Sequence, residues 1–515
     1  MRRPLRLLGP AVVSAGLIGL TACSTGTGPT SSPDTLRIAG PFEVHSLDPA
    51  VDGEVFTRLQ VAETLVTSDI DGELAPALAT DWSSSSDHTE WTFDLVEGAT
   101  FHDGTPVTPD TVIGALETAA AQEASPLAET PIEALRAQGS SVVVELAAPY
   151  LTLPAVLTHY STAVLAPGSY DDAGRVTSVI GSGPYEVERV QLPASIRTTR
   201  FDGWRDAPPA IRNVSFQSVG RAETRALMAA SDQADVVFGL EPAGRQRIET
   251  TAGVGLESSL QPRTILLKVN AGHPALADVR VRRALSLALD REAMAGAVLR
   301  EEGLAATQLL PPSLDSWQAD LEPLRHDREA ARALLAEAGW APGADGMLHR
   351  DGEPLRLDLL TYPDRAELPA LATAIQAALA DVGVAVDVEV ANSSEIPAAQ
   401  ADDSLELALI AKHFALVSDP LIDVAAVFDP DGADWGVMNW RDPAVETAVE
   451  ALLAGAPEDA AVEHRRAIVG TAQSQLPLIP VAWYRMNAAV SESVEGFVLD
   501  PLETSWRITD LRWAS

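Results

Sequence analysis

The stretch from residue 262 to residue 294 constrains the fold most, because it predicts a β-strand that leads into a capped helix. Thr264–Val269 alternates and is rich in strand-forming residues. Asp278 can accept hydrogen bonds from the free backbone N–H groups of a helix that begins at Val279. Helical spacing then gives one apolar face, formed by Val281, Ala284, Leu285, Ala288 and Leu289. We therefore predict a buried helix that opens a new lobe.

Three arginines lie toward the edges of that apolar face: Arg280, Arg282 and Arg283. Runs of like charge on a helix usually form a solvated surface. We expect these side chains to lie in water rather than to form an anion site.

Strands and helices alternate along the chain, which predicts an α/β fold. Residues 211–217 and 234–240 read as strands that flank a helix at residues 222–230, in the manner of a βαβ unit. Residues 365–382 read as a helix, and residues 385–390 and 405–411 read as two further strands, which again gives a strand-helix-strand order. This order favours a parallel sheet.

Local signals predict three more elements. Residues 55–65 have helical spacing, and residues 327–338 form a capped amphipathic helix that Gly339 ends. The Asp-Gly pair at positions 351 and 352 predicts a hairpin between residues 347–350 and 355–361.

Several short motifs resemble one known family. Asn270, Pro274 and the run from Asp278 to Met294 resemble the mid-chain signature of the family 5 solute-binding proteins, which are the peptide and nickel receptors of ABC importers. Other motifs agree with that family in order and spacing: Ser46–Pro49; Gly72, Pro76, Leu78, Ala79 and Trp82; Phe101–Thr108; and Gly181–Tyr185. Residues 211–216 and 224–242 look most like the nickel-receptor branch.

The resemblance implies a two-lobed, periplasmic-binding-protein-like fold with mixed sheets, an extra small lobe and a ligand cleft between the lobes. It assigns residues 34–66, 180–262 and 488–515 to the first lobe, 67–179 to the small lobe and 263–487 to the second lobe. Clefts of this kind commonly bind small solutes by hinge closure. The implied function is capture of an extracellular peptide or nickel or metal chelate for an ABC permease, by a monomer without enzyme activity or cofactor.

Composition argues against a nucleic-acid partner and indicates a globular protein. The formal net charge is −37 over 515 residues, and a protein surface with such an excess of negative charge would repel a phosphate backbone. Hydrophobic residues make up 46% of the chain, which is typical of a globular protein. The length predicts two to four packed units.

The N-terminus has the features of a targeting segment. A basic start precedes an apolar run at residues 7–20, which is short for a membrane span. Cys23, the only cysteine, follows small residues and resembles the lipidated cysteine of a bacterial lipobox. Residues 24–33 form a flexible tether rich in Gly, Ser, Thr and Pro. We predict a signal peptide over residues 1–23 and a lipid anchor outside the cytoplasm; a plain signal peptide with an incidental cysteine is the alternative.

Aromatic side chains in irregular segments are natural ligand contacts because they offer flat apolar area with little entropy to lose. The family resemblance places ligand contacts at Phe56, Tyr160, Phe414, Ser418, Asp419, Trp435 and Thr504. Ser418 and Asp419 belong to the Ser-Asp-Pro turn that corresponds to the family's turn beside the ligand.

Departures from the family leave the ligand open. The nickel branch holds an anionic chelate with arginines of the small lobe, yet residues 121–130 and 152–164 of this chain contain no arginine. Phe414 replaces a tryptophan of that branch, and residues 416–418 lack the aspartate that binds the amino terminus in the dipeptide branch. A peptide, a differently held chelate and another small solute all remain possible.

Metal ligation and catalysis have no clear sequence signal. The nine histidines are scattered without a zinc-site spacing, and we expect His159 and His413 to be structural. No G-x-S-x-G elbow or zinc motif supports a secreted hydrolase. An extracellular ligand sensor with the same fold is the other alternative to a transport receptor.

Overall fold

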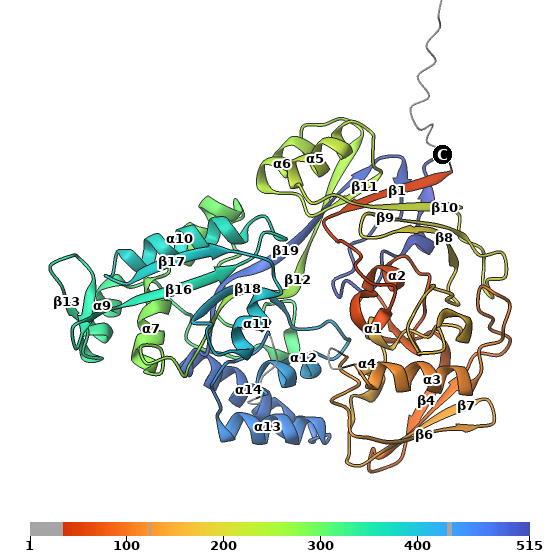
Figure 1. Cartoon of the computed structure of the whole chain (residues 1–515), viewed down its shortest axis with the longest axis horizontal. Coiled ribbons are helices and arrows are strands. Elements are labelled where there is room, and N and C mark those ends of the chain that lie inside the picture. The colour runs from red at the N-terminus through yellow and green to blue at the C-terminus, as the bar shows by residue number, and fades with distance from the viewer. Residues whose placement is uncertain (1–33, 123–124, 430–434) are drawn as a thin grey trace, which may run out of the picture. The chain divides into compact units, whose positions relative to one another are not determined.

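A mixed ten-stranded sheet runs through the body of this computed structural model, which describes residues 34–122, 125–429 and 435–515. The strand order is β17 (Ala385–Val390), β16 (Arg356–Thr361), β18 (Leu407–His413), β12 (Val254–Val269), β19 (Leu478–Ser491), β11 (Val236–Phe238), β1 (Thr35–Gly40), β10 (Asn213–Ser218), β9 (Ser195–Arg200) and β8 (Tyr185–Gln191). Figure 1 shows β12 and β19 at the middle of this sheet. The predicted lipidation site, signal peptide and tether lie outside the described residues.

The longest strands, β12 and β19, pair antiparallel along most of their length. Their register shifts between Leu260 and Thr264, so the ladder breaks where Pro262 cannot donate a backbone hydrogen bond. On one side of the break β12 also pairs with β18. On the other side β19 pairs with β11. These two strands therefore connect the two halves of the sheet.

The α/β prediction is confirmed by parallel pairs in both halves of the sheet. β16 is parallel to β17 and β18, while β1 is parallel to β10 and β11. Helix α5 (Ala222–Ala230) lies between β10 and β11 in sequence, as the βαβ interpretation requires. The other helices of this half and its neighbours are α1 (Pro49–Asp52), α2 (Glu54–Arg58) and α6 (Pro242–Ile248).

The other half of the sheet carries most of the longer helices. They are α7 (Val279–Ala288), α8 (Arg291–Met294), α9 (Arg328–Glu337), α10 (Leu368–Ala380), α11 (Glu395–Ala401), α12 (Pro420–Val427), α13 (Pro443–Leu453) and α14 (Glu458–Gln475). Both predicted caps are confirmed: Asp278 accepts a hydrogen bond from the backbone N–H of Arg280 at 2.8 Å, and Asp327 accepts one from Ala330 at 2.9 Å. The predicted apolar face of α7 is buried.

A separate four-stranded sheet has the order β4 (Ala79–Ser84), β5 (Glu90–Leu95), β7 (Ser141–Leu146) and β6 (Ile132–Gln138). Helix α3 (Pro109–Ala120) packs on β6 and β7, and Figure 1 shows these elements together. The apolar core of this sheet also includes Val417, from the turn before α12, and Ile422, from α12 itself. Short pairs complete the fold: β2 (Val66–Ser68) with β3 (Leu74–Pro76), and β20 (Val494–Glu495) with β21 (Arg512–Trp513). The lobe boundaries predicted above stay predictions.

Three local predictions need correction. Arg282 is only 3% exposed, because its guanidinium donates to the carbonyls of Leu276, Ala277 and Gln475. Gln475 is the last residue of α14, so Arg282 supplies a donor to carbonyls that a helix end leaves unpaired. Arg280 and Arg283 are exposed, as predicted.

The other two corrections concern element boundaries. The helix predicted at residues 55–65 ends at Arg58, because Gln60 takes a left-handed conformation with φ 55°. The hairpin partner of β14 (Leu348–Arg350) is the two-residue β15 (Glu353–Pro354), and β13 (Ala341–Pro342) pairs on its other side. The longer strand, β16, instead joins the main sheet, where both its neighbours are parallel.

No helix among the described residues is long and apolar enough to cross a membrane. This finding concerns residues 34–122, 125–429 and 435–515.

Replacing Gly181 with alanine should lower the free energy of unfolding by about 2 kcal/mol. A Cβ at this position would lie 2.0 Å from the carbonyl oxygen of Val61, so the glycine-rich turn would have to move. Gly114→Ala is the matched control, since its added Cβ meets nothing within 4 Å and α3 should gain about 0.5–1 kcal/mol. Urea unfolding of both variants checks the pair, and equal stability of the two would contradict the packing argument.

Candidate ligand-binding site

A cavity of about 410 Å³ lies where several distant segments meet. Its wall includes residues from α2 and the turn after it, from 158–160, from 204–207, and from 502–509, together with Leu416. The early end of α2 matters here, because the turn at Gln60 brings Ala62, Glu63 and Thr64 into the wall. A cavity of this size can hold a small solute.

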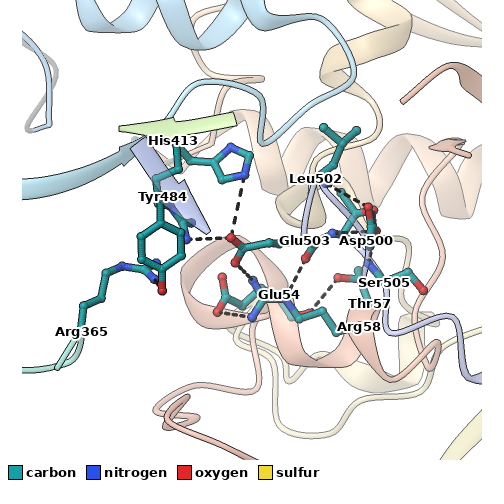
Figure 2. Close-up of polar contacts among 12 residues, drawn as sticks. Glu54, Thr57, Arg58, Arg365, His413, Tyr484, Asp500, Leu502, Glu503 and Ser505 are labelled. Atoms are coloured by element: carbon teal, nitrogen blue, oxygen red, sulfur yellow. Dashed lines mark hydrogen bonds and ion pairs between the residues drawn. The ribbon is translucent and has the colours of Figure 1, made fainter. Parts of the chain in front are cut away.

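The segment at residues 500–505 is organised by the Asp500 carboxylate. This carboxylate accepts hydrogen bonds from the backbone N–H groups of Leu502, Thr504 and Ser505, at 2.9, 3.1 and 2.9 Å. It also accepts one from the Thr504 hydroxyl at 2.8 Å. Glu503 takes a left-handed backbone conformation with φ 59°. The turn therefore holds Thr504 at the cavity and directs Glu503 into the interior (Figure 2).

The Glu503 carboxylate joins three separate parts of the chain. Its Oε1 lies 2.7 Å from Nη1 of Arg263 on β12 and 3.9 Å from Nε2 of His413 on β18. Its Oε2 lies 3.6 Å from Nη2 of Arg58 on α2, and Arg58 Nε donates to the Glu503 carbonyl at 2.8 Å. Figure 2 shows His413 and Arg58 on different sides of this carboxylate.

Burial and charge act in opposite directions on this cluster. Burial would raise the pKa of the Glu503 carboxyl, but the nearby Arg263, Arg58 and Arg365 guanidinium groups lower it to about 2. Burial, with Arg263 as a further cause, holds the pKa of His413 well below its ordinary value. Glu503 is therefore ionised and His413 neutral at pH 7.

Around this core, further groups extend the cluster. Arg58 also donates to the Glu54 carboxylate at 3.1 Å, within one turn of α2. Arg365 donates to the Tyr484 hydroxyl at 3.1 Å, and the Tyr484 ring lies 5.3 Å from the Arg263 guanidinium. The cluster therefore extends from Glu54, in the first turn of α2, to Tyr484 on β19.

A second ion pair forms another part of the wall. Arg205 binds both oxygens of the Glu63 carboxylate, with Nη1 to Oε2 at 2.8 Å. Ser182 donates to the same carboxylate at 2.9 Å. The Arg205 guanidinium also lies 4.2 Å from the centre of the Trp204 ring. The charge of Arg205 in this part of the wall is therefore already paired with a carboxylate.

The structure brings two of the predicted ligand contacts to this cavity, Tyr160 and Thr504. Ser418 and Asp419 line a different cavity of about 520 Å³, where Asp419 caps α12 and burial raises the pKa of its carboxyl. Trp435 packs edge-on against Tyr362, with ring centres 6.0 Å apart. All five positions stay predictions as ligand contacts.

Phe56 and Phe414 are both fully buried among apolar neighbours. Neither belongs to the wall of the 410 Å³ cavity. Their role as ligand contacts also stays a prediction.

The sequence did not predict the charged part of the cavity wall, which is formed by Arg58, Glu63, Arg205 and Glu503. Glu503 directly precedes the predicted contact Thr504, and this adjacency was the one available signal. Among the described residues, no group of three His, Cys, Asp or Glu side chains is placed to hold a metal ion.

Comparison with known proteins gives a consistent match. The family model described as bacterial extracellular solute-binding proteins, family 5 Middle, matches residues 73–433. The nickel-binding periplasmic protein of Escherichia coli (strain K12) is 23% identical over 512 residues, covering 95% of this chain and 96% of that protein. The dipeptide-binding protein of the same organism is 24% identical over 464 residues, covering 84% of each.

Solved structures agree on the fold. NikA from Brucella suis in complex with Fe(III)-EDTA has a TM-score of 0.84 at 23% identity, covering 93% of this chain and 100% of that one. NikA from Staphylococcus aureus in complex with Ni(L-His)2 has a TM-score of 0.81 at 18% identity, with the same coverage. The predicted two-lobed, periplasmic-binding-protein-like fold is confirmed.

Replacing Glu503 with glutamine should cost about 3 kcal/mol of unfolding free energy at pH 7, because it leaves Arg263 buried without its charge partner. The folded pKa of about 2 lies below the ordinary value of 4.5, so this stabilisation is complete above pH 4.5 and is lost as the pH falls toward 2. Urea unfolding between pH 7 and pH 2.5 should therefore show the native chain and the variant converging.

The matched control is Glu495→Gln, whose carboxylate forms an exposed pair with Arg512. It should change stability by less than about 0.5 kcal/mol. A Glu503→Gln variant as stable as this control at pH 7 would contradict the role assigned to the cluster.

Proposed function

Because the chain belongs to the family 5 bacterial extracellular solute-binding proteins, we propose that it is the receptor of an ABC importer that captures a small solute in the 410 Å³ cavity. The observation that carries the proposal is this cavity, whose wall joins the C-terminal turn, α2 and residues 158–160. The receptor would hold the solute by non-covalent contacts alone and deliver it to a membrane permease. It would act as a monomer.

We propose a peptide or a nickel or metal chelate as the solute. Relatives are named for nickel and for dipeptides, and one structural neighbour is a complex with Ni(L-His)2. In this chain Tyr160 and Thr504 are the predicted contacts that line the cavity, so they are the first residues to test.

We also propose that Cys23 carries a lipid that holds the protein at the outer face of the cell membrane. The support is its sequence context: a basic start, an apolar run and small residues precede it, and a flexible tether follows. A receptor on such a tether would reach the permease by diffusion close to the membrane surface.

Native mass spectrometry of the full chain, purified from its own host in detergent, should show a bound small molecule. Thr504→Val should weaken binding of that molecule about tenfold, because one hydrogen-bonding hydroxyl of the wall is lost. Thr80→Val is the matched control, since its hydroxyl bonds to the Asp94 carbonyl on an exposed strand. Deletion of the gene should abolish uptake of the same molecule; normal uptake would contradict the transport role.

Replacing Cys23 with alanine should release the protein from the membrane fraction into the medium or periplasm. The native chain should incorporate a labelled fatty acid, and the variant should not. Membrane association that survives the substitution would refute lipidation at this residue.

A further inference from the structure

We propose that the cavity takes a small solute that brings hydrogen-bond donors, such as ammonium or hydroxyl groups, and carries no net negative charge. This inference rests on the proposed function and narrows its ligand. It depends on the polar groups of the wall that already form ion pairs or hydrogen bonds within the protein.

The two arginines among the described lining residues are both paired with carboxylates. Arg205 is held by both oxygens of Glu63. Arg58 binds Glu54 and contacts both the carboxylate and the carbonyl of Glu503. An anionic ligand would have to displace these pairs to reach a guanidinium, and it would then leave a wall carboxylate without its partner.

Four of the six threonines among the described lining residues have also used their donors. Thr57 donates to the Glu54 carbonyl at 2.9 Å, Thr64 to the Val66 carbonyl at 2.6 Å and Thr158 to the Ala155 carbonyl at 2.7 Å. Thr504 donates to the Asp500 carboxylate at 2.8 Å. A hydroxyl has one proton and two lone pairs, so each of these groups can only accept a hydrogen bond from a ligand.

Charge along the wall favours the same kind of ligand. The described lining residues include four acids, Glu54, Glu63, Asp206 and Glu503, and two arginines, Arg58 and Arg205, a difference of two negative charges. Arg263, behind the wall, compensates one of them through Glu503. The side chain of Asp206 is 68% exposed and lies 3.9 Å from Arg205, so it faces solvent with a weak partner.

These observations describe a wall rich in acceptors, with its cations neutralised and a small excess of negative charge. Such a wall complements amine and hydroxyl donors. It opposes solutes whose binding groups are mainly carboxylates, including anionic metal chelates. A peptide or a neutral chelate fits the wall, provided that its donors face the acids and threonines.

The first experiment presents the full chain with a mixture. Detergent-purified, extensively dialysed protein is equilibrated against an ultrafiltered rich-medium extract, and retained molecules are identified by mass spectrometry. Retained solutes should carry amines or hydroxyls and a net charge of zero or above. Retention of net-negative solutes would overturn this inference while the solute-binding function stands. A folded protein that retains nothing would contradict the proposed function itself.

The second experiment removes the carboxylate partner of one wall arginine. Glu63→Gln leaves Arg205 without its bidentate partner in the cavity, so affinity for Fe(III)-EDTA, a chelate with one negative charge, should rise at least tenfold over the native chain. Glu54→Gln, which removes one of the two carboxylate partners of Arg58, tests the same point if the first variant is unstable.

Glu301→Gln is the matched control, because Glu301 pairs with Arg245 and Arg485 away from this cavity. It should leave Fe(III)-EDTA binding unchanged. Tight binding of Fe(III)-EDTA by the native chain, with no gain in either cavity variant, would overturn the inference.

Discussion

The buried Glu503 carboxylate is the interaction on which the central part of this structure depends. It lies between Arg263 on the long strand β12, His413 on β18 and Arg58 on α2. Two buried arginines close to one another would be strongly unfavourable without this negative charge. The same carboxylate therefore stabilises the sheet and fixes the α2 wall of the cavity, so that scaffold and site share one electrostatic centre.

The long paired strands explain why one carboxylate can contact elements from distant parts of the chain. β12 and β19 extend through both halves of the ten-stranded sheet, and their register shifts near Pro262, close to Arg263. The Asp500 turn then brings the C-terminal segment against this point. The pairing of the long strands sets the position of Arg263, and the Asp500 turn sets the direction of the Glu503 side chain (Figure 2).

Elements governed by neighbours in sequence could be predicted. The Asp278 and Asp327 caps, the apolar face of α7 and the parallel strand order all follow from local spacing. The prediction for Arg282 was wrong because one of its three acceptor carbonyls, that of Gln475, lies at the end of α14, 193 positions away. The charged wall was missed for the same reason: Arg58 and Glu503 are separated by 445 positions, and no local pattern reports such a pair.

Family membership and ligand chemistry are consequently decided by different residues. The motifs that identify the family lie in turns, caps and core segments, such as the glycines that pass close to the backbone at Gln60 and Val61. Under the proposed function, ligand chemistry depends on which charges in the wall remain unpaired after folding. In this chain folding pairs Arg58 and Arg205 with carboxylates, and four of the wall threonines donate their hydroxyl protons to acceptors within the protein. A shared fold can therefore accept solutes of different charge by changing only a few ion pairs in the wall.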